Sequence, residues 1–142
     1  MEPILHLSIP VRDLGEARAF YVETLGCRGT RSRPGFTDVF FYGMQVTLHE
    51  RPDEAALIPG GCRHFGVTLD HKEFAETVQR LDARGVRWLV PVSTDDPGEP
   101  TEQTKGKIVD PSGNVIELKT YRDVAAALEL RPEHREATSA ER

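Results

Sequence analysis

The sequence predicts an α+β fold in which two βαβββ modules form a cupped mixed sheet. Three observations lead to this prediction: strand and helix signals recur in the same order, the two copies keep a near-constant spacing, and apolar residues alternate within short segments.

The first copy begins with an alternating strand pattern at residues 4–11. Asp13, followed three residues later by Glu16, is a capping-box pattern that opens a helix. The helix buries one apolar stripe that includes Tyr21 and ends at Gly26.

The second copy repeats these signals. Residues 62–69 have a strand pattern, Asp70 and Glu73 repeat the capping box, and Gly85 ends the helix. The two capping aspartates are 57 residues apart and the two terminating glycines are 59 apart. A matched spacing of this kind indicates a duplicated unit.

The later strands also correspond, with residues 42–49 matching residues 112–119 at an offset of 70. Residues 110–113 have the composition of a type I turn and should join two antiparallel strands. Residues 91–103 are expected to be irregular because prolines and a glycine interrupt them. Asp123 is expected to cap a short final helix.

These signals divide the chain into a first module at 1–50, a linker at 51–61 and a second module at 62–121. Residues 122–142 are expected to hold the short helix and a flexible tail. With 142 residues, the whole is expected to form one domain.

The composition argues against several classes of function. A net charge of −5 with interspersed signs argues against binding to nucleic acid or to an anionic membrane surface. No apolar run approaches the roughly 18 residues that a membrane span needs. Cys27 and Cys62 show no paired spacing, so a cytoplasmic protein with reduced thiols is expected.

The candidate site residues are His6, His64 and Glu117. Each histidine is expected to open the first strand of its module, while Glu117 lies on the last strand of the second. Alternate strand residues share a face, so Thr47 and His49 should share the matching face of the first module. Two imidazoles and a carboxylate form the donor set typical of open Fe(II) sites, which other divalent ions also accept.

The chain resembles the vicinal oxygen chelate superfamily, which includes glyoxalase I, extradiol dioxygenases, fosfomycin-resistance enzymes, methylmalonyl-CoA epimerase and bleomycin-resistance proteins. The matching segments are residues 6–14, 20–26, 63–67 and 110–118. The resemblance implies a cupped sheet, a homodimer often built by exchange of strands, and a divalent metal chelated by vicinal oxygens of a small-molecule substrate.

Glyoxalase I has four metal ligands, one from the first strand and one from the last strand of each module. By resemblance, His6, His64 and Glu117 match three of these positions, whereas Thr47 occupies the fourth and is a poor ligand. This departure favours a three-ligand Fe(II) site and extradiol-dioxygenase-type oxygen chemistry. His49 either completes the site or acts as the catalytic proton-transfer residue.

Other interpretations remain open. A glyoxalase- or epimerase-like lyase or isomerase would use Ni, Zn, Mn or Co, and a bleomycin-type protein would bind its ligand without a metal. Glu117 could instead form a buried ion pair with an arginine. Gln103, Lys105 and Lys107 alternate on one strand and could reach an anionic substrate, although solvated strand residues are the simpler interpretation.

Overall fold

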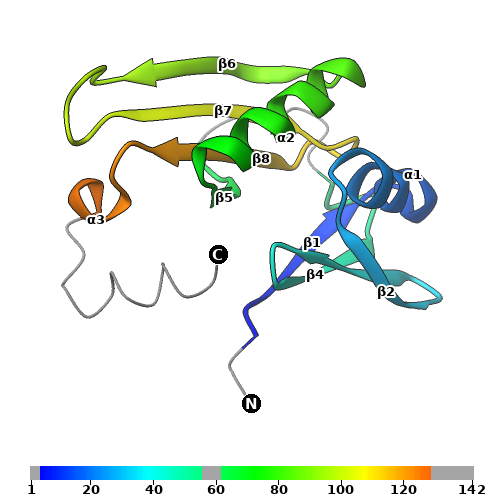
Figure 1. Ribbon diagram of the computed structural model, residues 1–142. Coiled ribbons are helices and arrows are strands. Elements are labelled where there is room, and N and C mark those ends of the chain that lie inside the picture. The colour runs from blue at the N-terminus through cyan, green and yellow to red at the C-terminus, as the bar shows by residue number, and fades with distance from the viewer. Residues whose placement is uncertain (1–3, 56–61, 129–142) are drawn as a thin grey trace.

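Two four-stranded mixed sheets make up the protein in a computed structural model that describes residues 4–55 and 62–128 (Figure 1). The strands of the first sheet are β1 (His6–Val11), β2 (Arg28–Arg33), β3 (Phe36–Phe41) and β4 (Met44–Glu50). Those of the second are β5 (Phe65–Thr68), β6 (Trp88–Asp95), β7 (Gln103–Val109) and β8 (Val115–Tyr121). The orders are β1-β4-β3-β2 and β5-β8-β7-β6, with a parallel first pair in each sheet. The predicted fold class of two βαβββ modules is confirmed.

The helices begin where the sequence predicts. They are α1 (Leu14–Ala19), its π-helical continuation η1 (Phe20–Thr24), α2 (His71–Ala83) and α3 (Val124–Ala127). The carboxylates of Asp13, Asp70 and Asp123 each accept a hydrogen bond from a backbone N–H in the first turn of their helix. None of the helices in the described ranges is long and apolar enough to cross a membrane.

Two expectations about strand limits are wrong. Residues 91–103 are not irregular throughout, because β6 continues to Asp95 and only residues 96–102 lie between strands. Pro91 is tolerated because β6 is an edge strand whose register with β7 shifts around Val90 and Ser93. The strand expected at 62–69 is shorter, so His64 lies immediately before β5.

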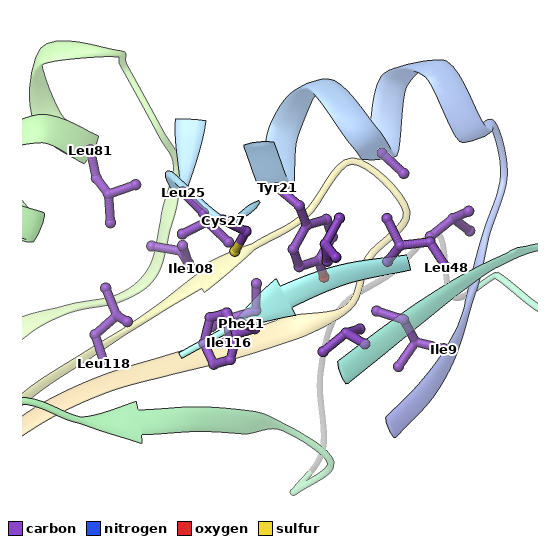
Figure 2. Close-up of a cluster of buried hydrophobic side chains, with 14 of the residues drawn as sticks. Ile9, Tyr21, Leu25, Cys27, Phe41, Leu48, Leu81, Ile108, Ile116 and Leu118 are labelled. Carbon is purple, nitrogen blue, oxygen red and sulfur yellow. The ribbon is translucent and has the colours of Figure 1, made fainter. Parts of the chain in front are cut away.

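Both sheets contribute to one hydrophobic core (Figure 2). Alternate residues of the inner strands enter it, such as Val46 and Leu48 of β4 and Ile116 and Leu118 of β8. Leu81 of α2 covers the second sheet, and Phe41 of β3 contacts Phe65 of β5 edge to face. Because the two sheets turn these faces toward a shared core, their polar faces lie on the outer sides.

The turn between β7 and β8 is held by the carboxylate of Asp110. Its Oδ1 accepts hydrogen bonds from the backbone N–H groups of Ser112 and Asn114, both at 2.8 Å. Its Oδ2 accepts from the Asn114 amide at 2.7 Å and from the buried Tyr21 hydroxyl at 3.0 Å. Burial raises the pKa of Asp110, and these hydrogen bonds act against that rise.

The same turn is fastened to the end of β1. The backbone N–H of Arg12 donates to Ser112 Oγ at 2.9 Å, and the Asn114 amide donates to the carbonyl of Pro10 at 3.0 Å. Together with Tyr21 at the start of η1, these bonds join the two halves of the chain across about a hundred residues of sequence. The turn therefore acts as a clamp between the modules.

Replacing Tyr21 with phenylalanine should destabilise the protein by about 1–3 kcal/mol, because a buried carboxylate oxygen loses a donor while the ring stays in place. The free energy of unfolding from urea denaturation measures this. Tyr42→Phe is the matched control, because Tyr42 is exposed and its hydroxyl makes no side-chain hydrogen bond found in the described residues. Equal stability of the two variants would show that the Tyr21–Asp110 bond contributes nothing.

Candidate metal site

His64 and Glu117 lie together on the outer face of the second sheet. His64 Nε2 is 3.4 Å from Glu117 Oε2, and the carboxylate side chain is only 8% exposed. Gly66, two residues after His64, is paired with Glu117 in the parallel β5–β8 ladder. This register brings the imidazole diagonally across to the carboxylate.

The tautomer of His64 is set by a backbone carbonyl. His64 Nδ1 lies 2.7 Å from the carbonyl oxygen of Cys62, which can only accept, so Nδ1 carries a hydrogen. In the neutral ring Nε2 then presents a lone pair to the Glu117 carboxylate. A proton on Nε2 or a metal ion would bridge these two atoms. This is the arrangement of a ligating histidine whose other nitrogen is held by a carbonyl.

Lys119 is the second partner of Glu117. Its Nζ lies 2.9 Å from Glu117 Oε2. Burial would raise the pKa of Glu117, but the hydrogen bond and charge of Lys119, followed by the charges of His64 and Lys107, lower it overall. Glu117 is therefore held as a carboxylate, the form that a metal requires. The ion pair considered from the sequence exists, with a lysine instead of an arginine.

Gly66 allows β5 to lie close to Glu117. A Cβ atom built on Gly66 would overlap the carbonyl oxygen of Glu117, so no larger residue fits without moving one of the strands. The glycine thus permits the strand pairing that brings His64 to the carboxylate.

His6 is not brought to this pair within one chain. It is exposed at the start of β1 in the first sheet, where it is paired with Gln45. Within residues 4–55 and 62–128, no group of three His, Cys, Asp or Glu side chains is placed to hold a metal ion. His6 lies on the first sheet, whereas His64 and Glu117 lie at the second, and no strand ladder joins the two sheets among the described residues.

Thr47, at the position equivalent to Glu117, is committed to a different network. Its hydroxyl donates to Asp38 Oδ1 at 2.7 Å, while Gln45 and Arg31 bind Asp38 Oδ2 at 3.1 and 2.9 Å. Burial would raise the pKa of Asp38, but these hydrogen bonds outweigh it and lower the pKa. The fourth position is therefore occupied by a closed hydrogen-bond network.

His49 lies further along the same outer face. It is paired with Pro10, four residues beyond the level of His6, which corresponds to about 13 Å along the strand. Its half-buried ring packs against Phe36, with centroids 5.8 Å apart. A cavity of about 220 Å³ adjoins it, lined by Ser8, Ile9, Pro10, His49, Arg51 and Glu54. His49 thus stands apart from His6, beside space for a small molecule.

The sequence reasoning missed Lys119, Asp38 and Arg31. Lys119 carried a signal, since it alternates with Glu117 and shares its face. Asp38 carried a weaker one, an acidic residue among the apolar and aromatic residues of β3. Arg31 carried none, because its pairing with Asp38 depends on a β2–β3 register that shifts between Gly29 and Ser32.

The chain is similar to proteins of one superfamily. The model of the Glyoxalase/Bleomycin resistance protein/Dioxygenase superfamily matches residues 3–118. A solved glyoxalase/bleomycin resistance protein/dioxygenase from Alicyclobacillus acidocaldarius is 34% identical, with a TM-score of 0.77 over 85% of this chain and 92% of that one. No curated protein matches significantly.

Two structures of the fosfomycin resistance protein FosX from Listeria monocytogenes share the fold. The complex with Mn(II) and sulfate is 19% identical, with a TM-score of 0.71 over 91% of this chain and 97% of that one. A point mutant in complex with Mn(II) and 1S,2S-dihydroxypropylphosphonic acid is 18% identical, with a TM-score of 0.69 over the same shares.

Replacing Asp38 with asparagine should destabilise the protein by about 1–3 kcal/mol at pH 7, because the buried hydrogen bonds to a charged carboxylate are weakened. Since the native pKa is lowered, the stabilisation is complete above the unfolded value of about 3.9 and is lost as the pH falls through the native pKa. The stability gap between wild type and Asp38→Asn, measured by urea denaturation, should therefore narrow between pH 5 and pH 2.

The exposed Asp53 provides the control, because Asp53→Asn should change stability by less than about 0.5 kcal/mol at pH 7. A gap for Asp38→Asn that stays constant or widens toward low pH would contradict the assigned network.

Proposed function

Because the chain belongs to the Glyoxalase/Bleomycin resistance protein/Dioxygenase superfamily, we propose that it is a metal-dependent enzyme whose small-molecule substrate chelates a divalent ion through adjacent oxygens. The observation that carries the proposal is the His64–Glu117 pair, a buried carboxylate oxygen and an imidazole nitrogen 3.4 Å apart. Both donors are oriented by neighbouring groups, as ligating side chains require.

The donor set fits a divalent ion. His64 and Glu117 supply one nitrogen and one oxygen donor, and His6 of the partner subunit would supply the second nitrogen. Fe(II) suits such a set with open positions, and Ni, Zn, Mn or Co also accept it. The Mn(II) in FosX supports a divalent ion in this fold.

A homodimer would bring the two kinds of outer face together. One chain presents His6 on one face and His64 with Glu117 on another, and both faces carry exposed or half-buried polar residues. A second copy related by a twofold axis can place its first sheet opposite the second sheet of this chain, which creates two equivalent cups. Each cup would then hold His6 from one subunit and the other two ligands from its partner.

The reaction favoured is oxygen chemistry of the extradiol-dioxygenase type. Its support is the Thr47–Asp38 hydrogen bond, which leaves the fourth ligand position of the glyoxalase plan without a metal donor. When bound, the ion would act as a Lewis acid and a template for the chelating oxygens. His49 would hold or move a proton at its imidazole, beside the cavity that it lines.

A lyase or isomerase of the glyoxalase or epimerase type is the alternative enzyme, and metal-free binding of a small molecule is the non-enzymatic one. Oxygen consumption with a panel of catechols, compared with turnover of methylglyoxal and glutathione, separates the two enzymatic reactions. An absence of turnover together with an absence of bound metal would support the binding protein and overturn the proposal.

His64→Ala and Glu117→Gln should each lower the metal content by at least about tenfold, because a ligand is lost from a three-donor site. Inductively coupled plasma mass spectrometry of protein reconstituted with Fe(II) or Mn(II) measures the metal-to-protein ratio. His71→Ala, on the exposed first turn of α2, and Thr47→Val should keep wild-type metal content. Full metal occupancy in Glu117→Gln would rule out the proposed metal site.

Mixing two defective variants tests the shared cup. Subunits carrying His6→Ala and subunits carrying Glu117→Gln should bind little metal separately. After unfolding and refolding together, half the dimers are mixed and each has one intact cup, so about a quarter of all sites should regain metal. If all three ligands came from one chain, every site would stay defective and no metal would return.

A further inference from the structure

Three lysines lie on the outer face of the second sheet, beside the His64–Glu117 pair. Lys105 and Lys107 belong to β7 and Lys119 to β8. In the ladder Lys105 is directly opposite Lys119, and Lys107 is directly opposite Glu117. Residues directly opposite share a face, so like charges at such a pair destabilise the sheet. The two facing ammonium groups therefore require negative charges nearby.

The carboxylates nearby compensate the lysines incompletely. Lys119 Nζ binds Glu117 at 2.9 Å, and Lys105 Nζ binds Asp95 of β6, also at 2.9 Å. Lys107 has no carboxylate within 4.0 Å in the described part of the chain, and it faces Glu117 across the ladder. Three lysines against two carboxylates leave one net positive charge on this surface.

These charges are poorly screened. The side chains of Lys105 and Lys119 are only 32% and 27% exposed, and Lys107 is half-buried. Partly buried charges keep more of their field than fully solvated ones. A concentration of one sign in such a setting raises the local concentration of the opposite charge. The surface therefore favours an anion.

Neutral donors lie next to the lysines. Gln103 and Tyr121 are directly opposite each other at the next same-face level of the β7–β8 ladder, and the Tyr121 ring centroid is 5.9 Å from Lys119 Nζ. An amide N–H and a phenol O–H can donate to further oxygens of a bound group. The face thus offers ammonium groups and hydrogen-bond donors to a group with several oxygens.

We propose that Lys105, Lys107 and Lys119 form a subsite for an anionic group of the substrate, a carboxylate, phosphate or phosphonate. The inference rests on the proposed function, because the substrate that it describes is the one that reaches His64 and Glu117. It assigns a substrate class to the site: a molecule with chelating oxygens at one end and an anionic group at the other.

Glu117 couples the anion to the metal. The same Oε2 atom faces both His64 Nε2 and Lys119 Nζ, so a cation held by Glu117 and His64 takes over charge that Lys119 now compensates. With a divalent ion the face would carry three net positive charges instead of one. Metal and anion should therefore bind with positive cooperativity, and each should raise the affinity for the other by the same factor.

Titration calorimetry of the dimeric protein with methylphosphonate and with acetate, with and without Mn(II), tests the subsite. At least one anion should bind, and saturating Mn(II) should tighten its binding by about fivefold or more. Lys107→Met is the main variant, because Lys107 has no ion pair among the described residues and its removal should preserve folding. It should weaken anion binding by about tenfold, because one charge-assisted contact is lost.

Lys105→Met and Lys119→Met should weaken anion binding by a similar factor. Lys72→Met on α2 should leave the affinity for the anion unchanged, because the Lys72 side chain is 84% exposed. Which of the two probes binds identifies the anionic group. Failure of both anions to bind Mn(II)-loaded protein, or equal affinities in Lys107→Met and Lys72→Met, would overturn the inference alone. Lysine-dependent anion binding to a protein that takes up no Mn(II) would keep the subsite and refute the metal-dependent function.

Discussion

The hydrogen bonds of Asp110 are the constraint on which the rest of the structure depends. One buried carboxylate closes the β7–β8 turn and accepts the hydroxyl of Tyr21 from the other module. Ser112 and Asn114 of the same turn bind the end of β1. These bonds fix how the two sheets pack, because a buried polar network is favourable only when all of its members are satisfied. The turn between β7 and β8 therefore also connects the two modules.

This packing decides what one chain can present to a substrate. Apolar residues from both sheets are joined in one cluster, and each sheet keeps a separate polar face. His64 and Glu117 meet on one of them, whereas His6 lies on the other. In the proposed enzyme, a second copy would supply His6 to the face that holds His64 and Glu117. A core that buried the polar faces instead would leave their charges without solvent.

Within this frame the two outer faces have diverged. On the first sheet, Asp38 is satisfied by Thr47, Gln45 and Arg31, and the network is closed. On the second, Glu117 is shared between His64 and Lys119, and Lys107 lacks a nearby carboxylate among the described residues. The polar groups of the first sheet are therefore satisfied by one another, whereas the charges of the second sheet are compensated only in part.

By itself, the sequence determined the local features of this protein: the helix starts at Asp13 and Asp70, the turn at Asp110 and the duplicated order of strands. These features depend on contacts between residues close in the chain. The matched spacing of the two copies then predicted the fold of two βαβββ modules. Only the tertiary structure decided that β6 runs through Pro91 at a sheet edge, that Arg31 pairs with Asp38, and that His6 lies apart from His64. Those outcomes depend on local register shifts and on how the two modules pack, and both involve contacts between residues on different strands.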